Sequence, residues 1–362
     1  MKLPILRALD WSLFIAPLLL VGVGIATIYS TTLGTARDHL ATQQIVYAVL
    51  GVLLMVGLSL YDYRNLRNYS WLLYVVSLSL LIAVLIFGTK VFGATRWIDL
   101  GVFQLQPSEL LKASIILFAA SLLARGTVGW WKTLIWVVAM VAVPIGLVLR
   151  QPDLGTAIVI GVIFISLFFS WPIARRVKLI TFILILAILP LGWLIMKDYQ
   201  HQRIYTFINP GRDPYGSGYN VIQSLIAVGS GGVWGRGLGN GPQSQLNFLP
   251  VAHTDFIFAG WAESTGFVGA MGLIIVLALL NWRIYHVAVV AKDAFGKYLA
   301  IGFGAIITAQ IVINIGMNLG LAPVTGIPLP FVSYGGSSLV INFMMMGIMQ
   351  SIYLRHKKIT FS

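Results

Sequence analysis

Residues 298–320 read YLAIGFGAIITAQIVINIGMNLG, a segment of 23 residues without a charged side chain. At about 1.5 Å per residue, a helix of this length crosses the roughly 30 Å hydrocarbon layer of a bilayer. The segment therefore predicts a transmembrane helix.

Of the 362 residues in the chain, 58% are hydrophobic and only 10% are charged, whereas about 25% are charged in soluble domains. The composition therefore excludes a soluble globular protein.

Nine further segments have a similar length and few charges. They lie at roughly 11–30, 43–60, 70–88, 108–124, 133–149, 154–171, 177–196, 256–281 and 335–354. Together with residues 298–320 they predict an all-α, polytopic integral membrane protein of about ten transmembrane helices. Only one connection is much longer than about twenty residues, so we expect a single membrane domain over residues 1–362.

Basic residues outnumber acidic ones by 24 to 11, a net charge of +13, and their distribution predicts the orientation. Alternate connections hold Lys2, Arg7, Arg64, Arg67, Arg125, Lys132, Arg175, Arg176, Lys178, Arg283, Lys292, Lys297, Arg355, Lys357 and Lys358, whereas the short segments of the other set hold only Arg37, Lys90, Arg96 and Arg150. By the positive-inside rule, both termini are expected to be cytoplasmic. The basic excess then faces anionic lipid, and nucleic acid is not an expected partner. The absence of cysteine excludes disulfides and thiol nucleophiles.

The long connection, residues 197–255, is expected to lie on the outer side. It is rich in aromatic residues, which argues against disorder, and loops of this length are usually functional. Ten of the 33 residues from 209 to 241 are glycine, which permits close approach of the backbone to a ligand. Within it, YNVIQSLIAV (219–228) predicts a short helix at the membrane surface.

A second irregular segment, LAPVTGIPLPFVSYGGSS (321–338), separates the last two spans. It is apolar but interrupted by prolines and glycines. Non-helical backbone at membrane depth persists only where protein or a water-filled cavity satisfies its polar groups. The segment predicts a re-entrant or cavity-lining loop, and the alternative is an ordinary capping loop.

Four acidic residues near the outer ends of spans are the candidates for chemistry, because a carboxylate in hydrocarbon is costly unless it is paired or faces water. Asp255 and Glu263 are eight residues apart, which places them on nearly the same helical face. Asp153 starts the sixth span. Glu109 is spaced three residues from Lys112, so the two either form a structural ion pair or hold an anionic substrate.

Gln310, Asn314 and Asn318 recur every four residues in the ninth span and form one polar stripe. Two interpretations stay open for this stripe. It provides hydrogen bonds between helices, or it lines a polar cavity together with Asn342 of the tenth span.

Other chemistries are disfavoured by the residues present. The five histidines show no H-x-x-x-H spacing, and no G-x-S-x-G nucleophile motif occurs. A divalent cation, Mg²⁺ or Mn²⁺, held by Asp255 and an anionic ligand stays open. The remaining chemistry is a carboxylate general base, with cations and backbone amides that stabilise a leaving anion.

Five motifs carry a resemblance to a known family. They are GATRWIDLG (93–101), QPSEL (106–110), QPDLGTA (151–157), NPGRDPYGSGYNVIQSLIAVGSGGVWGRGLGNGPQSQLNFLPVAHTDFIFAGWAESTGFVG (209–269) and PVTGIPLPFVSYGGSS (323–338). In this order, and over nearly the whole chain, they resemble the SEDS family of bacterial shape, elongation, division and sporulation proteins. LGNGPQSQLNFLP (238–250) and FVSYGGSS (331–338) look more like its elongation branch than its division branch.

The resemblance implies a ten-helix peptidoglycan glycosyltransferase. It would polymerise lipid II at the outer face of the bacterial cytoplasmic membrane, with a class B penicillin-binding protein as its transpeptidase partner. The family's essential aspartate falls on Asp255, and its fourth-span carboxylate and lysine fall on Glu109 and Lys112. Two acids usual in the family are replaced here by Val251 and Ser264, which leaves Asp255 and Glu263 as the local carboxylates.

We therefore expect Asp255 to deprotonate the acceptor hydroxyl directly or through the cation, with inversion at the donor sugar. The candidate substrate contacts are Glu109, Lys112, Arg96, Arg203, Arg212, His253, Thr254 and Glu263. Lys112, Arg203 and Arg212 are the first candidates for pyrophosphate contacts and Arg96 is a secondary one, although Arg203 and Arg212 also fit solvated loop charges. The alternatives are a flippase for the lipid-linked precursor, a scaffold that activates a partner enzyme, and the division-specific member of the family.

Overall fold

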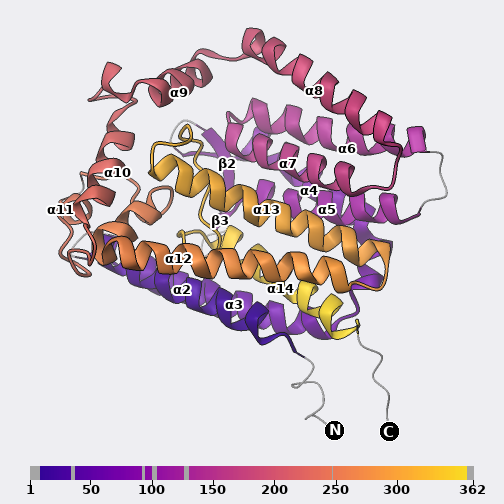
Figure 1. Cartoon of the computed structure of the whole chain (residues 1–362), viewed down its shortest axis with the longest axis horizontal. Coiled ribbons are helices and arrows are strands. Elements are labelled where there is room, and N and C mark those ends of the chain that lie inside the picture. The colour runs from indigo at the N-terminus through magenta and orange to yellow at the C-terminus, as the bar shows by residue number, and fades with distance from the viewer. Residues whose placement is uncertain are drawn as a thin grey trace, which may run out of the picture.

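The computed structural model of the protein describes residues 9–33, 37–91, 94–99, 104–125, 130–246 and 248–356. In this part of the chain, ten helices occupy the positions of the ten predicted spans (Figure 1). They are α2 (Trp11–Thr32), α3 (His39–Leu60), α4 (Leu66–Phe87), α5 (Pro107–Arg125), α6 (Trp130–Arg150), α7 (Leu154–Ser170), α8 (Arg175–Ile195), α12 (Ile257–Val290), α13 (Ala294–Asn318) and α14 (Gly336–Leu354). The largest difference from the predicted bounds is in α12, which continues to Val290.

Eight of the described helices are long and apolar enough to cross a membrane. Of the other two, α7 has 17 residues and α8 has 21. The prediction of an all-α, polytopic membrane protein is thus confirmed. Four of the basic residues used to predict its orientation, Lys2, Arg7, Lys357 and Lys358, lie outside the described residues.

The helices pack around a centre formed by α5, α13 and α14, which are the most buried of the spans. Helix α14 packs along α3, α12 packs against α2 and α13, and α13 packs against α5 and α7. Helix α8 runs along the outer edge of the bundle (Figure 1). We call the end of the bundle where α2 begins and α14 ends the terminal end, and the opposite end the loop end.

A small antiparallel sheet at the loop end connects α4 to α5. It consists of β1 (Thr89–Val91), β2 (Ala94–Asp99) and β3 (Gln104–Leu105), in the order β1-β2-β3. The sequence analysis did not predict it, because strands of two to six residues contain too few alternating positions for a recognisable period.

The long segment 197–255 is folded at the loop end. It contains α9 (Asp198–Ile208), the 3₁₀ turn η2 (Pro210–Arg212), α10 (Tyr219–Ser230) and the single turn α11 (Pro242–Gln245). The predicted helix at 219–228 is confirmed as α10, which packs against α12. Figure 1 shows these elements around the loop ends of α12 and α13.

Helix α12 is interrupted at Gly266, where φ is 67° and ψ is −165°, a conformation that is essentially restricted to glycine. The amide groups after the break lose their helical acceptors. Phe267 N donates instead to Gly232 O at 2.8 Å, and Val268 N donates to Val233 O at 3.2 Å. The glycine-rich segment therefore supplies the acceptors that the interrupted helix lacks.

The exchange runs in both directions. Arg236 N donates to Glu263 O at 3.0 Å, and Gly237 N donates to Ser264 O at 2.9 Å, so carbonyl groups before the break are also satisfied. The sequence analysis expected the glycines to bring the backbone close to a ligand. In residues 231–237 the close approach is instead to another part of the same chain, since polar backbone inside a membrane bundle needs protein partners.

The segment 321–338 is irregular as far as residue 335, as predicted. It lies inside the bundle, with Phe331 and Val332 fully buried. Residues 322–324 line a cavity at the loop end. The expectation of a cavity-lining loop is thus confirmed.

Replacing Gly266 with alanine is expected to destabilise the protein by about 2 kcal/mol or more, because its backbone conformation disfavours any Cβ and that Cβ would collide with Gly235 N. Gly272, in the same helix, has open space around its Cβ position. Gly272→Ala is therefore the matched control and should be neutral or slightly stabilising. Thermal unfolding of the two variants in detergent measures the difference, and equal unfolding temperatures would contradict the role of the break.

Candidate functional site

Asp255 lies in a turn immediately before α12, rather than on the helix itself. The expectation that Asp255 and Glu263 share one helical face is therefore wrong, because the helix begins at Ile257. The backbone oxygen of Asp255 accepts hydrogen bonds from Asn314 Nδ2 and Asn318 Nδ2, both at 3.0 Å. Two side chains of α13 thus hold the turn that presents the Asp255 carboxylate.

Asn318 replaces a missing helical hydrogen bond. Its Oδ1 accepts from Ala259 N at 3.1 Å while its Nδ2 donates to Asp255 O, the carbonyl four residues earlier. Asn314 Nδ2 also donates to Ile327 O at 2.7 Å, in the segment before α14. The hydrogen-bonding interpretation of the polar stripe is confirmed for these two asparagines. Gln310 is buried one turn away, and its amide has no hydrogen-bond partner among the described residues.

The Asp255 carboxylate has neither a hydrogen bond nor an ion pair within 4 Å among the described residues. It is partly accessible. Gly326, with φ of 74°, faces it so closely that a Cβ there would lie 3.5 Å from Asp255 Oδ2. A glycine at this position leaves space next to the carboxylate.

Burial raises the pKa of Asp255 to about 6. Arg203 and Arg96 oppose this effect, and the negative charge of Asp153 adds to it. The charges that act on Asp255 therefore come from three elements, α9, β2 and the start of α7. The carboxylate remains ionised at neutral pH and is more basic than an ordinary aspartate.

Arg96 is fixed to the turn before α7. Its Nε donates to Gln151 O at 3.2 Å, its Nη2 donates to Pro152 O, and Nε lies 3.9 Å from Asp153 Oδ2. Asp153 is buried and caps α7 by accepting from Thr156 N at 3.1 Å and Thr156 Oγ1 at 3.0 Å. Arg96 and Asp153 are thus held at the turn before α7, and they act on Asp255 through their charge.

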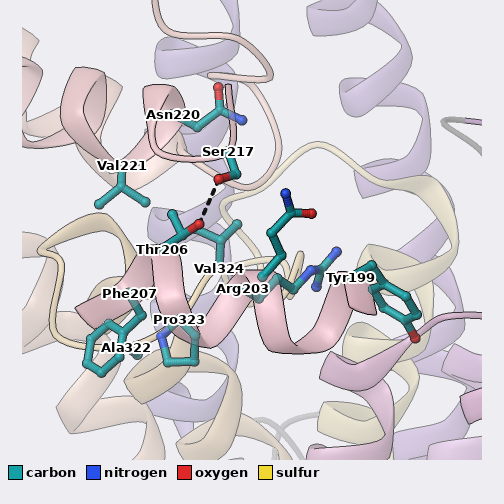
Figure 2. A pocket seen from close by; sticks show the side chains of 11 residues that line it. Tyr199, Arg203, Thr206, Phe207, Ser217, Asn220, Val221, Ala322, Pro323 and Val324 are labelled. Carbon is teal, nitrogen blue, oxygen red and sulfur yellow. Dashed lines mark hydrogen bonds between the residues drawn. The ribbon is translucent and has the colours of Figure 1, made fainter. Parts of the chain in front are cut away.

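Arg203 lines a cavity of about 270 Å³ between α9, the start of α10 and residues 322–324 (Figure 2). Its Nη1 is buried and has no hydrogen-bond partner in the described segments, and the same holds for Tyr199 Oη on the preceding turn of α9. Thr206 and Ser217 hydrogen bond to each other across the cavity wall at 2.8 Å. Burial, and next the charge of Arg96, lower the pKa of Arg203. An anion in this cavity would satisfy an unpaired guanidinium.

Arg212 is not brought to this cavity. It is exposed, and its guanidinium stacks over the Tyr205 ring at 5.7 Å. The solvated-charge interpretation therefore describes Arg212, whereas Arg203 is partly buried and faces the cavity.

His253 and Thr254 connect the turn to the segment before α14. The backbone oxygen of His253 accepts from Tyr334 N at 2.9 Å, and that of Thr254 accepts from Ser333 Oγ at 2.7 Å. Burial, and next the charge of Arg37, lower the pKa of His253 to about 4, so its ring is neutral at physiological pH. Both residues contribute to the framework of the Asp255 turn.

Glu263 is fully buried and binds α11. Its Oε1 accepts from Gln243 N at 2.8 Å, and its Oε2 accepts from Ser244 N at 3.1 Å and Ser244 Oγ at 2.5 Å. The carboxylate thereby caps the N-terminal end of a single helical turn. Glu263 thus has a structural partner in α11, and it does not line the cavity beside Arg203.

Glu109 and Lys112 form the ion pair that their spacing predicts, with Lys112 Nζ 2.7 Å from Glu109 Oε1. Both side chains are buried in α5, and neither is among the charges that act on Asp255. Glu109 and Lys112 thus pair with each other, and they are not among the charged residues around Asp255.

Few side chains near Asp255 could bind a metal ion. In the described part of the chain, no group of three or more His, Asp or Glu side chains lies close enough together to bind a metal ion. Of the four candidate acids, Asp255 is the one whose carboxylate oxygens have no hydrogen-bond partner among the described residues. A cation here would need oxygen ligands from an anionic substrate.

The sequence singles out Asp255 but does not show which residues hold its turn. Asn314 and Asn318 were noted as a stripe without a target, and Gly326 and Tyr199 were not noted as parts of the site. The four-residue spacing was the available signal for the asparagines. Gly326 and Tyr199 left no comparable pattern, because their importance depends on contacts between distant segments.

Comparison with known proteins identifies related chains. Over residues 7–358 the chain matches the FtsW/RodA/SpoVE family, described as cell cycle proteins. It is 39% identical over 313 residues to the peptidoglycan glycosyltransferase MrdB of Escherichia coli (strain K12), with 86% of this chain and 85% of MrdB covered. It is 35% identical to stage V sporulation protein E of Bacillus subtilis (strain 168), with 95% and 96% covered.

Solved structures are similar over almost the full length. A chain of a peptidoglycan synthase complex, described as coordinating polymerization and crosslinking, has a TM-score of 0.81 and 33% identity, with 96% of this chain and 98% of that chain covered. The crystal structure of the rod shape determining protein RodA of Thermus thermophilus has a TM-score of 0.71 and 29% identity, with 95% and 96% covered.

The raised pKa of Asp255 predicts a pH-dependent stability difference for Asp255→Asn. Below about pH 4 the carboxyl is protonated in both folded and unfolded chains, so it costs nothing. Above about pH 6 it is ionised in both, and its burial destabilises the fold. At pH 7.5 the asparagine variant should therefore be more stable by about 1–3 kcal/mol, and the gain should vanish as the pH falls to 4.

Thermal unfolding between pH 4 and 8, with EDTA present, measures this difference. Asp213 is the control, because hydrogen bonds from Ser217 lower the pKa of its exposed carboxyl. Asp213→Asn should give no gain in stability at pH 7.5. A gain for Asp255→Asn that does not change with pH would contradict the assignment.

Proposed function

The chain belongs to the FtsW/RodA/SpoVE family of cell cycle proteins, and we propose that it polymerises lipid II into glycan strands for cell-wall elongation and cell shape. It is a peptidoglycan glycosyltransferase, as its relatives are named. The resemblance drawn from its motifs is confirmed, and the chain is more similar to RodA than to FtsW. Substrate, catalytic residues, partner and orientation are the proposed parts of this function.

Asp255 is the general base in this proposal. The observation that carries it is that, of the four acids singled out from the sequence, Glu109, Asp153 and Glu263 have hydrogen-bond partners and the Asp255 carboxylate has none among the described residues. An unpaired, partly buried carboxylate with a pKa of about 6 suits proton abstraction at neutral pH. It would accept the proton of the acceptor hydroxyl.

The reaction then proceeds as one displacement. The acceptor oxygen forms a bond to the anomeric carbon of the donor, the bond from that carbon to the pyrophosphate oxygen breaks, and the electron pair leaves with the polyprenyl pyrophosphate. A single base and attack opposite the leaving group invert the configuration at that carbon. The chemistry therefore needs a base on one side and cations on the other.

Arg203 is the proposed pyrophosphate contact. Its Nη1 is buried at a cavity of about 270 Å³ without a partner among the residues that the structure describes, and its charge acts on the Asp255 carboxyl. Guanidinium groups suit phosphate oxygens because they offer paired donors in a plane. Arg96, held at the turn before α7, adds positive charge to the same region.

The other candidates take supporting roles in the proposal. Glu109 and Lys112 neutralise each other inside α5, Glu263 holds α11, and His253 and Thr254 fix the Asp255 turn. The following residues are assigned no direct substrate contact: Glu109, Lys112, Arg212, His253, Thr254 and Glu263.

A divalent cation, Mg²⁺ or Mn²⁺, is proposed to arrive with the substrate. Asp255 would supply one ligand, and pyrophosphate oxygens and water would supply the others. When bound, the cation would add positive charge beside the leaving group, the same contribution that Arg203 and Arg96 make.

The charge distribution supports the proposed orientation, and a related structure supports the proposed partner. Both termini are proposed to lie in the cytoplasm, so that the loop end with Asp255 faces outward. The membrane is then the bacterial cytoplasmic membrane. A class B penicillin-binding protein is the proposed partner, supported by the similarity to a chain of a complex that coordinates polymerization and crosslinking.

A reconstitution tests the function. Purified protein in detergent, with and without its penicillin-binding partner, receives lipid II and Mg²⁺ or Mn²⁺, and glycan products are resolved by length. The parent chain should give a ladder, and Asp255→Asn should lower the rate by about 10²-fold or more, because it removes the base and keeps the shape.

Asp198→Asn, which removes an exposed carboxylate from α9, is the control and should retain the parent rate. Equal ladders from Asp255→Asn and the parent would rule out Asp255 as the base. No ladder from the parent with the partner present would favour the flippase, since transport needs no polymerisation.

Arg203→Gln is expected to raise the KM for lipid II about tenfold or more, because a charge-assisted contact to the pyrophosphate is lost. Arg212→Gln removes the same charge from the same outer segment, but from an exposed side chain stacked on Tyr205. It should change KM less than about twofold. Steady-state rates over a range of lipid II concentrations measure both values, and similar KM values for the two variants would contradict the assignment of Arg203.

A further inference from the structure

A second cavity lies at the terminal end of the bundle, far along the helices from Asp255. It has a volume of about 380 Å³ and lies where α4 begins, α5 ends and α13 begins. Its walls include Arg64, Arg67 and Asn68 of α4, Ala124 of α5, and Asp293 and Phe295 at the start of α13. None of these residues takes part in the proposed glycosyl transfer.

The charges in this cavity leave one cation unpaired. The Asp293 carboxylate accepts from Gly296 N at 2.8 Å and from the Tyr63 hydroxyl, and lies 3.4 Å from Arg64 Nε. Arg64 and Asp293 therefore neutralise each other. The Arg67 guanidinium has no hydrogen bond or ion pair among the described residues. The cavity thus has a net positive charge and a free set of guanidinium donors.

The depth of the cavity is indicated by its aromatic neighbours. Tyr69 and Trp71 follow Arg67 and Asn68 in α4, and their side chains are 56% and 54% exposed. Exposed tyrosine and tryptophan near the end of a membrane span are typical of the interface where lipid headgroups lie. The cavity therefore opens at headgroup level.

An apolar path leads away from the cavity along α4. Leu72 and Val76 follow Asn68 at intervals of four residues, which places the three on one face of the helix. Leu72 is 44% exposed and Val76 is 45% exposed. In a bilayer these side chains contact acyl chains. A soluble anion would contact only the cationic cavity. A phospholipid would contact the cavity with its headgroup and the apolar face of α4 with its acyl chains.

We propose that this cavity binds the phosphate headgroup of an anionic phospholipid. Arg67 donates to the phosphate oxygens, Asn68 adds amide donors, and the acyl chains follow Leu72 and Val76 along α4. With both termini in the cytoplasm, the lipid belongs to the inner leaflet. The site is separate from the catalytic end, so it stands or fails independently of the role of Asp255.

Native mass spectrometry of the full chain in detergent tests this site with phosphatidylglycerol as the probe and phosphatidylcholine as the neutral comparison. Arg67→Gln should weaken phosphatidylglycerol binding about fivefold, which corresponds to the roughly 1 kcal/mol of one basic residue near an anionic membrane surface. Binding of phosphatidylcholine should be unchanged. The variant should fold normally, because Arg67 has no hydrogen bond or ion pair to lose among the described residues, and its thermal unfolding temperature in detergent should equal that of the parent.

Arg176→Gln is the matched control, since it removes an exposed charge from the start of α8, outside the cavity and at the same end of the bundle. It should leave phosphatidylglycerol binding within twofold of the parent. Equal losses for the two variants would overturn the site, because any surface charge would then suffice. Displacement of the lipid by inorganic phosphate at equal concentration would also overturn it, by identifying the ligand as a soluble anion.

Discussion

The backbone oxygen of Asp255 accepts two hydrogen bonds from side chains of α13, and the loop end of the bundle is organised around that oxygen. A polar backbone group inside a membrane protein must be satisfied by the protein itself. The turn before α12 removes the usual helical bond between Asp255 O and Ala259 N, and the Asn318 amide replaces both halves of it. Asn314 joins the same oxygen to Ile327 O, so one helix positions the carboxylate and the segment that faces it.

The same requirement explains the glycine-rich segment. The break at Gly266 exposes amides and carbonyls of α12, and residues 231–237 satisfy them in both directions. Glycine is needed because the two backbones approach so closely that side chains would collide. The first part of α12, which follows Asp255, is therefore held by α13 at its start and by residues 231–237 at its end. The position of the Asp255 turn in this protein therefore depends on how interrupted helices recover their hydrogen bonds.

Buried charged groups, like buried backbone groups, need partners within the protein. Buried carboxylates are costly, and Glu109, Asp153 and Glu263 are each satisfied by a cation or by helix-start donors. The Asp255 carboxylate has no such partner in the part of the chain that the structure describes, and its burial raises its pKa. Arg203 is its counterpart, a partly buried guanidinium with a free nitrogen. The two unsatisfied groups lie close enough to interact, and a substrate that brings a hydroxyl and a pyrophosphate would satisfy both.

The sequence by itself determined the ten spans, the helix at 219–228 and the cavity-lining character of 321–338, and it singled out Asp255 as a candidate. These features follow from local composition and spacing. In a bilayer, the length of an apolar segment decides whether it spans the membrane, and polar or non-helical residues within it must be satisfied by the protein. Only the tertiary structure decided that Glu263 caps α11, that Arg203 faces a cavity while Arg212 does not, and that the glycines pack against Gly266. Those outcomes depend on which distant segments meet, since a partner for a carboxylate, a guanidinium or a broken helix is supplied by contact in space and leaves no periodic signal along the chain.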